Sequence, residues 1–285
     1  MAIADALLYH AAKRLYRTEI AHTEEMKRSL SDMDAYDRFR SAEADKVIAR
    51  LKQYGIDIRG RTVVDFGCND GALSGRYLRE GAGRVIGLDI DAKALDRARL
   101  LQPAVTFLQS GVDRIPLDDA SIDVLVSFDV FEHVAQPLPI LREIHRILRP
   151  GGQVLIGTIG WRMPFAPHLW ATMPVPWAHV LTSERSLLRA CRRVYHSPWY
   201  TPNMHDLDAA GHRLADKYTA DRISRDYLNH YLVRDFERAF RDVGFNYRTH
   251  VQAIGGLAPL KPLCRVPWVR EFVGSAVWFV LARIN

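Results

Sequence analysis

A β-branched run and a glycine loop stand together in ten residues, TVVDFGCNDG, at positions 62–71. The run suits a strand that is buried on both faces of a parallel sheet. Gly67 and Gly71 allow the backbone to approach a ligand closely, and Asn69 adopts a left-handed conformation more readily than most residues. The spacing is DxGxxxG, so the GxGxxG fingerprint of dinucleotide sites is incomplete. This stretch predicts a strand that ends in a ligand-binding turn, and it leaves the ligand open.

Strand and helix patterns alternate after this loop. The predicted strands are 62–66, 85–89, 105–108, 122–128, 154–158, 247–254 and 275–282, and the predicted helices beside them are 73–80, 92–101, 138–148 and 233–243. Alternation of this kind predicts a parallel sheet with right-handed crossovers. The expected fold class is α/β. It is a Rossmann-like, doubly wound, mostly parallel seven-stranded sheet, with an N-terminal helical extension and a helical or irregular lid inserted after the fifth strand.

The chain is expected to divide into four segments. They are an N-terminal helical segment (1–60), a Rossmann-like core (61–158), a lid or substrate insertion (159–230), and a C-terminal helix with the closing strands of the core (231–285). Prolines recur in the insertion, and only Ser183 to Arg193 has a regular helical pattern there, with Ser183 as its cap. A stretch this long without a clean period is uncommon unless it works as a lid or binding element.

Composition excludes several classes of protein. Hydrophobic residues make up 48% and charged residues 25% of the 285 residues, which is ordinary globular usage. Cys68, Cys191 and Cys264 lie far apart without a CxxC pair or a Cys/His cluster, so we expect neither a zinc site nor a disulfide framework, and a reducing, cytoplasmic setting. The first twenty residues have neither a secretory apolar region nor a membrane span. The net charge of +6 lies entirely beyond residue 160, together with all 6 tryptophans.

A carboxylate ends the second predicted strand. Asp89 stands at the end of this strand, and ligands of open α/β sheets sit at the carboxyl ends of the strands. An acid at this place can accept hydrogen bonds from both hydroxyl groups of a ribose. The two loops together predict nucleoside binding, without saying which nucleoside.

Four stretches extend the pattern to a known family. VVDFGCNDG, VIGLDID, IPLDDASIDVLVSFDVFEHV and LREIHRILRPGGQVLI, in this order and spacing, resemble the successive motifs of class I S-adenosylmethionine-dependent methyltransferases. The resemblance covers about residues 62–158. It is closest to the broad group that includes quinone-biosynthesis and small-molecule methyltransferases. It implies S-adenosylmethionine as the cofactor, S-adenosylhomocysteine as the product, and no metal.

The resemblance also implies which residues contact the cofactor. They are Asp65, Gly67, Cys68, Asn69, Gly71, Asp89, Ile90, Val112, Asp113, Ser127, Phe128 and Asp129. Residues 65–71 would frame the methionine portion, with Cys68 and Asn69 contributing mainly backbone. Asp89 would hold the ribose hydroxyls and Ile90 would lie against the adenine. Residues 127–129 would face the methionine end and the transferred methyl group.

The chain departs from the family pattern on the adenine side. Many relatives carry an Asp after the third strand, where this chain has Gly111. Asp113 could substitute from two residues on, or the backbone of Val112 could hold the adenine alone. Simpler interpretations also stand: Asp65 could cap a turn, and Asp89 could be a solvated loop carboxylate. Arg142, Arg146 and Arg149, with His145, are interpreted as a solvated helix face.

Methyl transfer from a sulfonium needs alignment and sometimes a base. Alignment can contribute about 7–11 kcal/mol, whereas a positioned base adds about 10²–10⁴ in rate. The candidate bases are His133 in the EHV segment and two lid histidines, His168 and His179, which stand among tryptophans. The alternative is that these tryptophans pack the lid and these histidines are exposed.

The predicted function is methyl transfer to a small-molecule acceptor. A weaker resemblance, to methyltransferases of glycan and natural-product pathways, favours O-methylation of a saccharide or another hydroxylated metabolite, and it brings Asn229 and His230 toward the site. The alternatives are a non-catalytic methyltransferase-like scaffold subunit, an RNA- or lipid-directed methyltransferase, and an NAD-linked reductase. Nucleic acid is not favoured, although Arg185, Arg189, Arg192 and Arg193 cluster on one side of a helix. Peripheral membrane contact ranks below lid packing. The oligomeric state is left open.

Overall fold

The computed structural model describes residues 2–16, 33–208, 210–254 and 258–284, and the chain forms two compact units. The sheet unit comprises Arg40–Gly160 and Asn229–Asn285. The insertion unit comprises Met1–Phe39 and Trp161–Leu228. Part of the predicted N-terminal helical segment, residues 17–32, lies outside the described residues. The four-segment division expected from the sequence stays a prediction.

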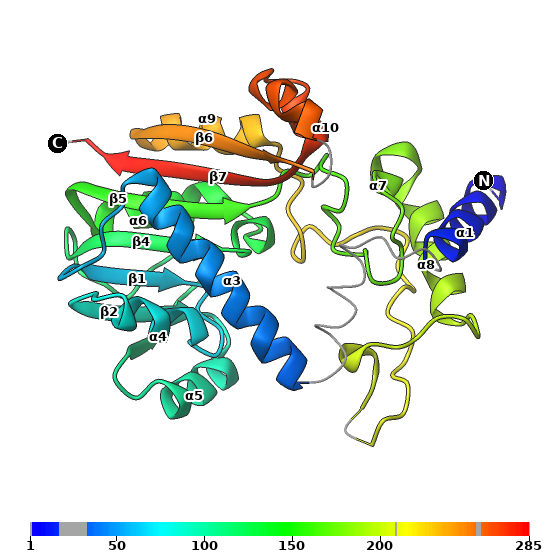
Figure 1. Cartoon of the computed structure of the whole chain (residues 1–285), viewed down its shortest axis with the longest axis horizontal. Coiled ribbons are helices and arrows are strands. Elements are labelled where there is room, and N and C mark those ends of the chain that lie inside the picture. Colours follow the sequence, from blue (N-terminus) through cyan, green and yellow to red (C-terminus); the bar gives the residue numbers. More distant parts are fainter. Residues whose placement is uncertain (1, 17–32, 209, 255–257, 285) are drawn as a thin grey trace. The chain divides into compact units, whose positions relative to one another are not determined.

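The sheet unit carries seven strands in the order β3-β2-β1-β4-β5-β7-β6 (Figure 1). Their bounds are β1 Thr62–Phe66, β2 Arg84–Asp89, β3 Thr106–Gln109, β4 Ile122–Phe128, β5 Leu148–Thr158, β6 Phe245–Ala253 and β7 Gly274–Arg283. The first five strands are parallel, and β7 runs antiparallel to both β5 and β6. The predicted α/β class and the mostly parallel seven-stranded sheet are confirmed.

Helices cover both faces of this sheet. Their bounds are α3 Met33–Tyr54, α4 Ala72–Arg79, α5 Ala92–Leu101, η1 Phe131–His133, α6 Pro137–Ile147, α9 Val233–Val243, η3 Ala258–Arg265 and α10 Arg270–Val273. Buried residues of α3, α4 and α5, such as Val47, Tyr77 and Leu95, share one core cluster with Val63 and Val124 of the sheet. Adjacent strand residues point to opposite faces, and α9 packs on the other face, against Phe279 of β7. Strands β2, β1 and β4 are neighbours in the sheet, so their carboxyl ends lie next to one another and the loops that follow them meet at one edge.

Strand β5 differs from its prediction. The predicted strand begins at residue 154, whereas the extended segment begins at Leu148 and includes the Pro-Gly-Gly at 150–152. Leu148 pairs with Ile122 of β4, and the register shifts between that pair and the next. Gly151 has φ +75°, a conformation that glycine adopts without strain. The Pro-Gly-Gly therefore forms an irregularity inside a paired strand.

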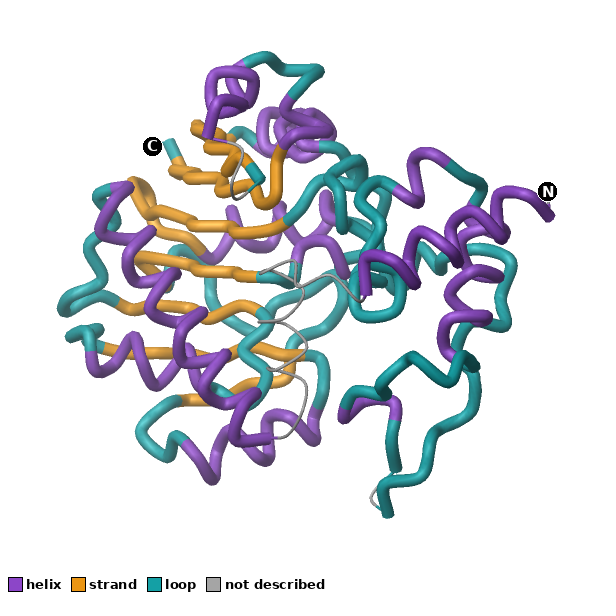
Figure 2. Tube along the Cα trace, turned by 45° about the vertical axis from the view of Figure 1, so that its right-hand side comes forward, coloured by secondary structure: helices purple, strands orange, loops and turns teal. Residues whose placement is uncertain are grey.

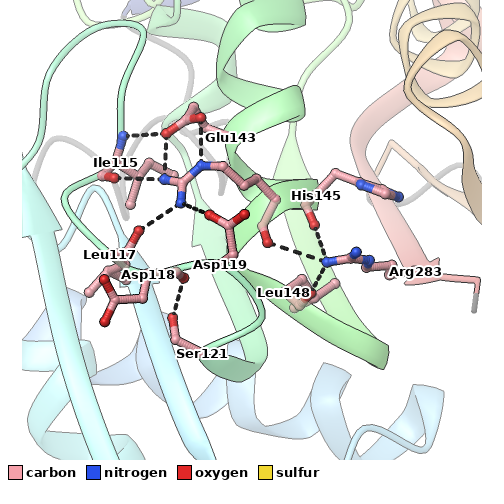
Figure 3. Close-up of polar contacts among 10 residues, drawn as sticks. Ile115, Leu117, Asp118, Asp119, Ser121, Glu143, His145, Leu148 and Arg283 are labelled. Atoms are coloured by element: carbon pink, nitrogen blue, oxygen red, sulfur yellow. Dashed lines mark hydrogen bonds and ion pairs between the residues drawn. The ribbon is translucent and has the colours of Figure 1, made fainter.

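Arg146 contradicts the interpretation of the α6 face as solvated. Its guanidinium donates to Leu117 O at 2.8 Å and to Ile115 O at 3.0 Å, and it pairs with the carboxylates of Glu143 and Asp119 (Figure 3). Glu143 in turn accepts the Ile115 N–H at 3.1 Å. The segment between β3 and β4 contains no helix. The bonds of Arg146 to its carbonyl groups hold this connecting loop in place.

We expect Arg146→Ala to lower the free energy of unfolding by about 2–3 kcal/mol, because charge-assisted hydrogen bonds are lost and Glu143 is left without its cation. Arg142→Ala, on the exposed side of the same helix, should change it by less than about 0.5 kcal/mol. Urea denaturation of both variants measures the difference. Equal losses of stability in the two variants would show that Arg146 does not hold the loop between β3 and β4 in place.

Two further side chains fasten the sheet unit. Arg283 of β7 donates to the carbonyl oxygens of His145, at 3.0 Å, and Leu148, at 2.5 Å, and so satisfies the carboxyl end of α6. Glu271 of α10 is buried and accepts the N–H groups of Val233 at 2.9 Å and Arg234 at 3.1 Å. A carboxylate at this position caps the first turn of α9.

The insertion unit is built from short helices and loops (Figure 2). Its elements are α1 Ala2–Tyr16, α7 Ala178–Leu181, α8 Glu184–Tyr195 and η2 Met204–Asp206. Residues of α1, such as Leu8 and Ala12, share an apolar cluster with Leu187 and Val194 of α8. The predicted cap is confirmed, since Ser183 Oγ accepts the Ser186 N–H at 3.2 Å.

The basic face of α8 is partly neutralised within the unit. Arg185 pairs with Asp221 and Arg192 with Asp216, each at 2.7 Å. These ion pairs reduce the positive charge that a phosphate backbone would meet. Within the described ranges, no helix is both long enough and apolar enough to cross a membrane.

Candidate functional site

The glycine loop and the β2 exit meet directly. Gly67, Asn69 and Gly71 have φ of +81°, +48° and +77°, which turn the chain from β1 into α4. One oxygen of Asp89 accepts the Asn69 N–H at 2.8 Å, and the other accepts the Asp91 N–H at 3.0 Å. Backbone donors therefore fix the carboxylate beside the loop. Each oxygen retains a lone pair for a ligand.

Asp65 is buried at the end of β1. Its Oδ2 accepts the Ser74 hydroxyl at 2.5 Å. Burial raises the pKa of Asp65 to about 6, although the Ser74 hydrogen bond and the positive charge of Arg40 oppose the rise. Near neutral pH this carboxyl group is mostly ionised, yet it is easily protonated below its pKa. A cation bound beside it would favour the ionised form.

A small hollow opens at this edge of the sheet. Its lining comes from α3, the β1 loop, α4 and the end of β4, and consists of Arg40, Glu43, Ala44, Asp65, Gly67, Cys68, Leu73 and Phe128. The α3 residues were missed in the sequence because an Arg and a Glu three apart on a helix form no chemical motif. Only the path of α3 across the sheet brings them here.

Cys68 supports the glycine loop by packing its side chain into the core of the sheet unit. Its side chain is buried in the core cluster, and a Cβ on Gly87 would lie 2.9 Å from its Sγ. Burial raises the pKa of the Cys68 thiol well above its ordinary value. The residue packs the loop onto β2. Because its thiol stays protonated, it does not supply the thiolate that a nucleophile needs.

The loops after β2 and β3 are joined. Gln109 Nε2 donates to Ile90 O at 3.0 Å, and the Ser110 N–H donates to Asp89 O at 2.8 Å. Two apolar side chains stand out from these loops, since Ile90 is 63% and Val112 75% exposed. Exposed apolar side chains beside a ribose-type carboxylate suit a flat aromatic base.

Asp113 stands close to the position where many relatives carry an acid. Its Oδ1 lies 3.7 Å from where a Cβ of Gly111 would be. The Gly111 N–H donates to Arg114 O at 3.0 Å, which closes residues 111–114 into a turn. Asp113 therefore lies near the position of that acid, although two residues further along the chain.

The three predicted cofactor residues at the end of β4, Ser127, Phe128 and Asp129, have different surroundings. Ser127 is fully buried, and its hydroxyl has no hydrogen-bond partner within the described residues. Phe128 lines the hollow and stacks on Trp278, with ring centroids 5.4 Å apart, where Gly157 leaves room for both rings. Asp129 has φ +54° and donates its N–H to Gly157 O.

The segment after β4 is held by buried polar groups. Glu132 accepts the Thr158 hydroxyl at 2.6 Å, and burial raises its pKa. Asn229 donates from Nδ2 to the carbonyl oxygens of Phe131 at 2.6 Å and Val134 at 2.8 Å. His133 ends this turn and is half-buried. Asn229, expected near the site from the weaker resemblance, therefore supports the turn that carries His133.

The lid histidines belong to the insertion unit. His179 is buried, with Nε2 2.6 Å from Trp161 O, so that nitrogen carries a proton. It lines a mainly apolar hollow together with Trp170 and Met173. His168 is half-buried and has φ +55°. The catalytic roles of His133, His168 and His179 stay predictions.

Comparisons with known proteins find similarity to methyltransferases over part of the chain. Residues 64–156 match the family model described as a methyltransferase domain. The chain is 38% identical over 108 residues to a probable S-adenosylmethionine-dependent methyltransferase of Mycolicibacterium smegmatis, covering 38% of this chain and 41% of that protein. It is 34% identical over 125 residues to the malonyl-[acyl-carrier protein] O-methyltransferase of Serratia marcescens, covering 44% and 48%. These matches span less than half of either relative.

Solved structures show the same fold. An S-adenosylmethionine-dependent methyltransferase from Mesorhizobium loti has a TM-score of 0.51 at 20% identity, covering 82% of this chain and 96% of that one. A complex of the Haloferax volcanii Trm112 methyltransferase activator with a methyltransferase matches with a TM-score of 0.51 at 21% identity, covering 90% and 99%. At these identities the likeness concerns the fold alone.

Proposed function

We propose that this chain, whose residues 64–156 match a methyltransferase domain, transfers the methyl group of S-adenosylmethionine to a small-molecule acceptor and releases S-adenosylhomocysteine. The observation that carries the proposal is the Asp89 carboxylate, fixed by the Asn69 N–H beside the glycine loop with lone pairs left for a ribose. When bound, the cofactor supplies a methyl group that is already activated as a sulfonium.

The residues of the sheet unit fit that cofactor. Asp89 would accept the ribose hydroxyls, Ile90 and Val112 would flank the adenine, and Asp113 would accept from its amino group. The β1 loop, residues 65–71, would hold the methionine portion, with Cys68 and Asn69 present as backbone. Ser127 has an unused hydroxyl at the β4 exit, and we assign Phe128 and Asp129 to the methyl-bearing end.

The proposed acceptor is a saccharide or another hydroxylated metabolite. Tryptophans and histidines gather in the insertion unit, and such side chains stack on rings while offering a proton acceptor. The main work of the chain would be to hold acceptor and methyl group in line, since alignment contributes more than a base does. The carrier-protein methylation named for the Serratia relative is a competing acceptor class.

Calorimetry with purified protein tests the proposal. S-adenosylmethionine and S-adenosylhomocysteine should bind, whereas NAD should not. Transfer of a radiolabelled methyl group to a panel of saccharides, carrier-linked acids, RNA and lipids then identifies the acceptor. No cofactor binding at millimolar concentration would sink the proposal. Binding without transfer to any class would favour the scaffold alternative.

Cofactor affinity is expected to depend on pH through Asp65. Its raised pKa of about 6 means that the carboxyl group gains a proton as the pH falls through that value. A cationic ligand binds the ionised form better, so affinity should fall by up to about tenfold from pH 7 to pH 5. Titrations across this range measure it. Asp65→Asn should flatten the profile, and an equally steep profile in that variant would contradict the assignment.

The lid histidines have a kinetic test. We expect His168→Ala or His179→Ala to lower kcat by about 10²-fold with little change in cofactor affinity, which is the usual contribution of a positioned base. His205→Ala, an exposed histidine of the same unit, serves as the control. Unchanged turnover in both lid variants would remove these histidines from the mechanism and leave His133 as the candidate.

A further inference from the structure

The connection between β6 and β7 is longer than the pairing of these strands requires. Ala253 of β6 lies opposite Gly274 of β7, so residues 254–273 join two strand ends that are already side by side. Loops between such strands usually contain about 2–5 residues. This connection instead forms η3 and α10, which extend beyond the edge of the sheet made by β6 and β7 (Figure 1). Long connections in compact domains are often functional.

Apolar side chains of this connection face solvent. Trp268 is 72% and Leu263 39% exposed, whereas the other five tryptophans of the chain are buried or half-buried. Pro262 and Pro267 are exposed as well. Because proline has no N–H group, these positions leave fewer backbone donors to be desolvated against an apolar phase. A surface of this kind marks an interaction site more often than a solvated loop does.

Hydrogen bonds and an ion pair hold these side chains in place. The Val266 N–H donates to Leu263 O, and the Arg270 N–H donates to Val266 O, each at 3.0 Å. Arg270 also pairs with Glu237 of α9 at 2.6 Å, and both of these side chains are largely buried. Little conformational freedom is therefore lost when Trp268, which lies between these bonds, meets a partner.

The connection is also positively charged. No acidic residue stands between Asp242 and Glu271, and Glu271 is buried. Lys261 and Arg265 are exposed, and in the part of the chain that the structure describes no ion pair engages either of them. The same short segment therefore combines exposed apolar side chains with uncompensated cations.

A lipid surface with anionic headgroups complements this combination. Tryptophan is enriched where hydrocarbon meets headgroups, and each Lys or Arg close to an anionic surface adds to binding. Stable attachment takes two signals, and apolar insertion together with positive charge supplies both. A nucleic acid would call for more cations than Lys261 and Arg265, because its affinity depends on several phosphate contacts.

The connection leaves the sheet at the edge where the candidate site lies. Strands β5 and β6 both run antiparallel to β7, so their carboxyl ends lie at the same edge. Thr158, the last residue of β5, pairs with Val277 near the beginning of β7. The parallel strands that carry the glycine loop and Asp89 end at this edge too.

We propose that residues 261–268 bind a lipid surface with anionic headgroups. Trp268 and Leu263 enter the boundary between headgroups and hydrocarbon, and Lys261 and Arg265 lie among the headgroups. The carboxyl edge of the sheet then faces acceptors that are held in or at the membrane. Because this binding needs no cofactor, it stands or falls separately from methyl transfer.

Sedimentation of the full chain with lipid vesicles tests the proposal. The chain should bind vesicles of phosphatidylglycerol and phosphatidylcholine in equal parts much more tightly than vesicles of phosphatidylcholine alone. Neutralising both cations, in Lys261→Gln with Arg265→Gln, should lower affinity for the anionic vesicles about 30-fold. Trp268→Ala should lower it about tenfold. Arg97→Gln with Leu100→Ala, both exposed on α5, is the matched control and should leave it unchanged.

Trp268→Phe separates insertion from a folding defect. Phenylalanine keeps an apolar ring, so affinity should stay within about threefold. Quenching of tryptophan fluorescence by brominated lipid, strong in the unaltered chain, should largely disappear in this variant. Equal binding to both kinds of vesicle, or binding that survives the loss of both cations and of Trp268, would overturn the proposal. A dimer that Trp268→Ala separates, or binding of single-stranded RNA in place of vesicles, would overturn it as well.

Discussion

Replacing Gly67 with alanine is expected to lower the free energy of unfolding by about 3–5 kcal/mol and to abolish cofactor binding. Two effects add at this position. The backbone φ of +81° is strained for any residue with a Cβ. A Cβ there would also lie 2.9 Å from Cγ1 of Val130, and closer still to Cγ2, so the β4 exit would have to shift.

Gly151→Ala separates the two effects. Gly151 also has positive φ, at +75°, but its Cβ position is open space. That variant should lose only the backbone part, about 1 kcal/mol. Adding Val130→Ala to Gly67→Ala removes both clashing methyl groups and should recover part of the loss. Urea denaturation measures the free energy of unfolding of the two single variants and the double variant. If Gly67→Ala lowers it only as much as Gly151→Ala does, the loop moves away from Val130 without further cost.

Asp89→Ala is expected to weaken cofactor affinity by about 1.5–3 kcal/mol, or roughly tenfold to 150-fold. The carboxylate would accept the ribose hydroxyls, and it also accepts the Asn69 and Asp91 N–H groups that shape the site. Calorimetry with S-adenosylhomocysteine measures the loss.

Asp91→Ala is the matched control for Asp89→Ala. Asp91 lies two residues away and caps α5 by accepting the Lys93 N–H at 2.9 Å. Its loss should cost stability, about 1 kcal/mol, with little change in affinity. An Asp89→Ala affinity equal to that of the unaltered chain would refute the ribose assignment.

Local sequence patterns were sufficient for the sheet because each strand carries its own signal. The runs at 62–66 and 122–128 are β-branched and bounded by turn residues, so their limits could be read directly. Strand β5 was misjudged because Pro150 and two glycines are turn residues by local preference. Pairing of Leu148 with Ile122 overrides that preference, and a pairing of this kind is invisible in the segment itself.

Only part of the site could be predicted, because some of its residues reach it through packing that local sequence does not reveal. Asp65 and Asp89 stand at the ends of β1 and β2, and the glycine loop follows β1 directly, so position in the chain predicts position in space. Arg40 and Glu43 reach the hollow from a helix whose path depends on packing over the whole sheet face. Arg146 looked like one of several exposed helix arginines, and only the folded loop beneath it reveals its acceptors.

The strand order has a consequence for biosynthesis. Strand β7 lies between β5 and β6, although it follows both of them along the chain. As the polypeptide leaves the ribosome, β5 and β6 emerge first, and each has an unpaired edge until β7 inserts between them. Arg283 and Glu271, which fasten α6 and α9, are translated after those helices. The nascent sheet therefore remains open, and exposed to chaperones or to wrong partners, until β7 has emerged.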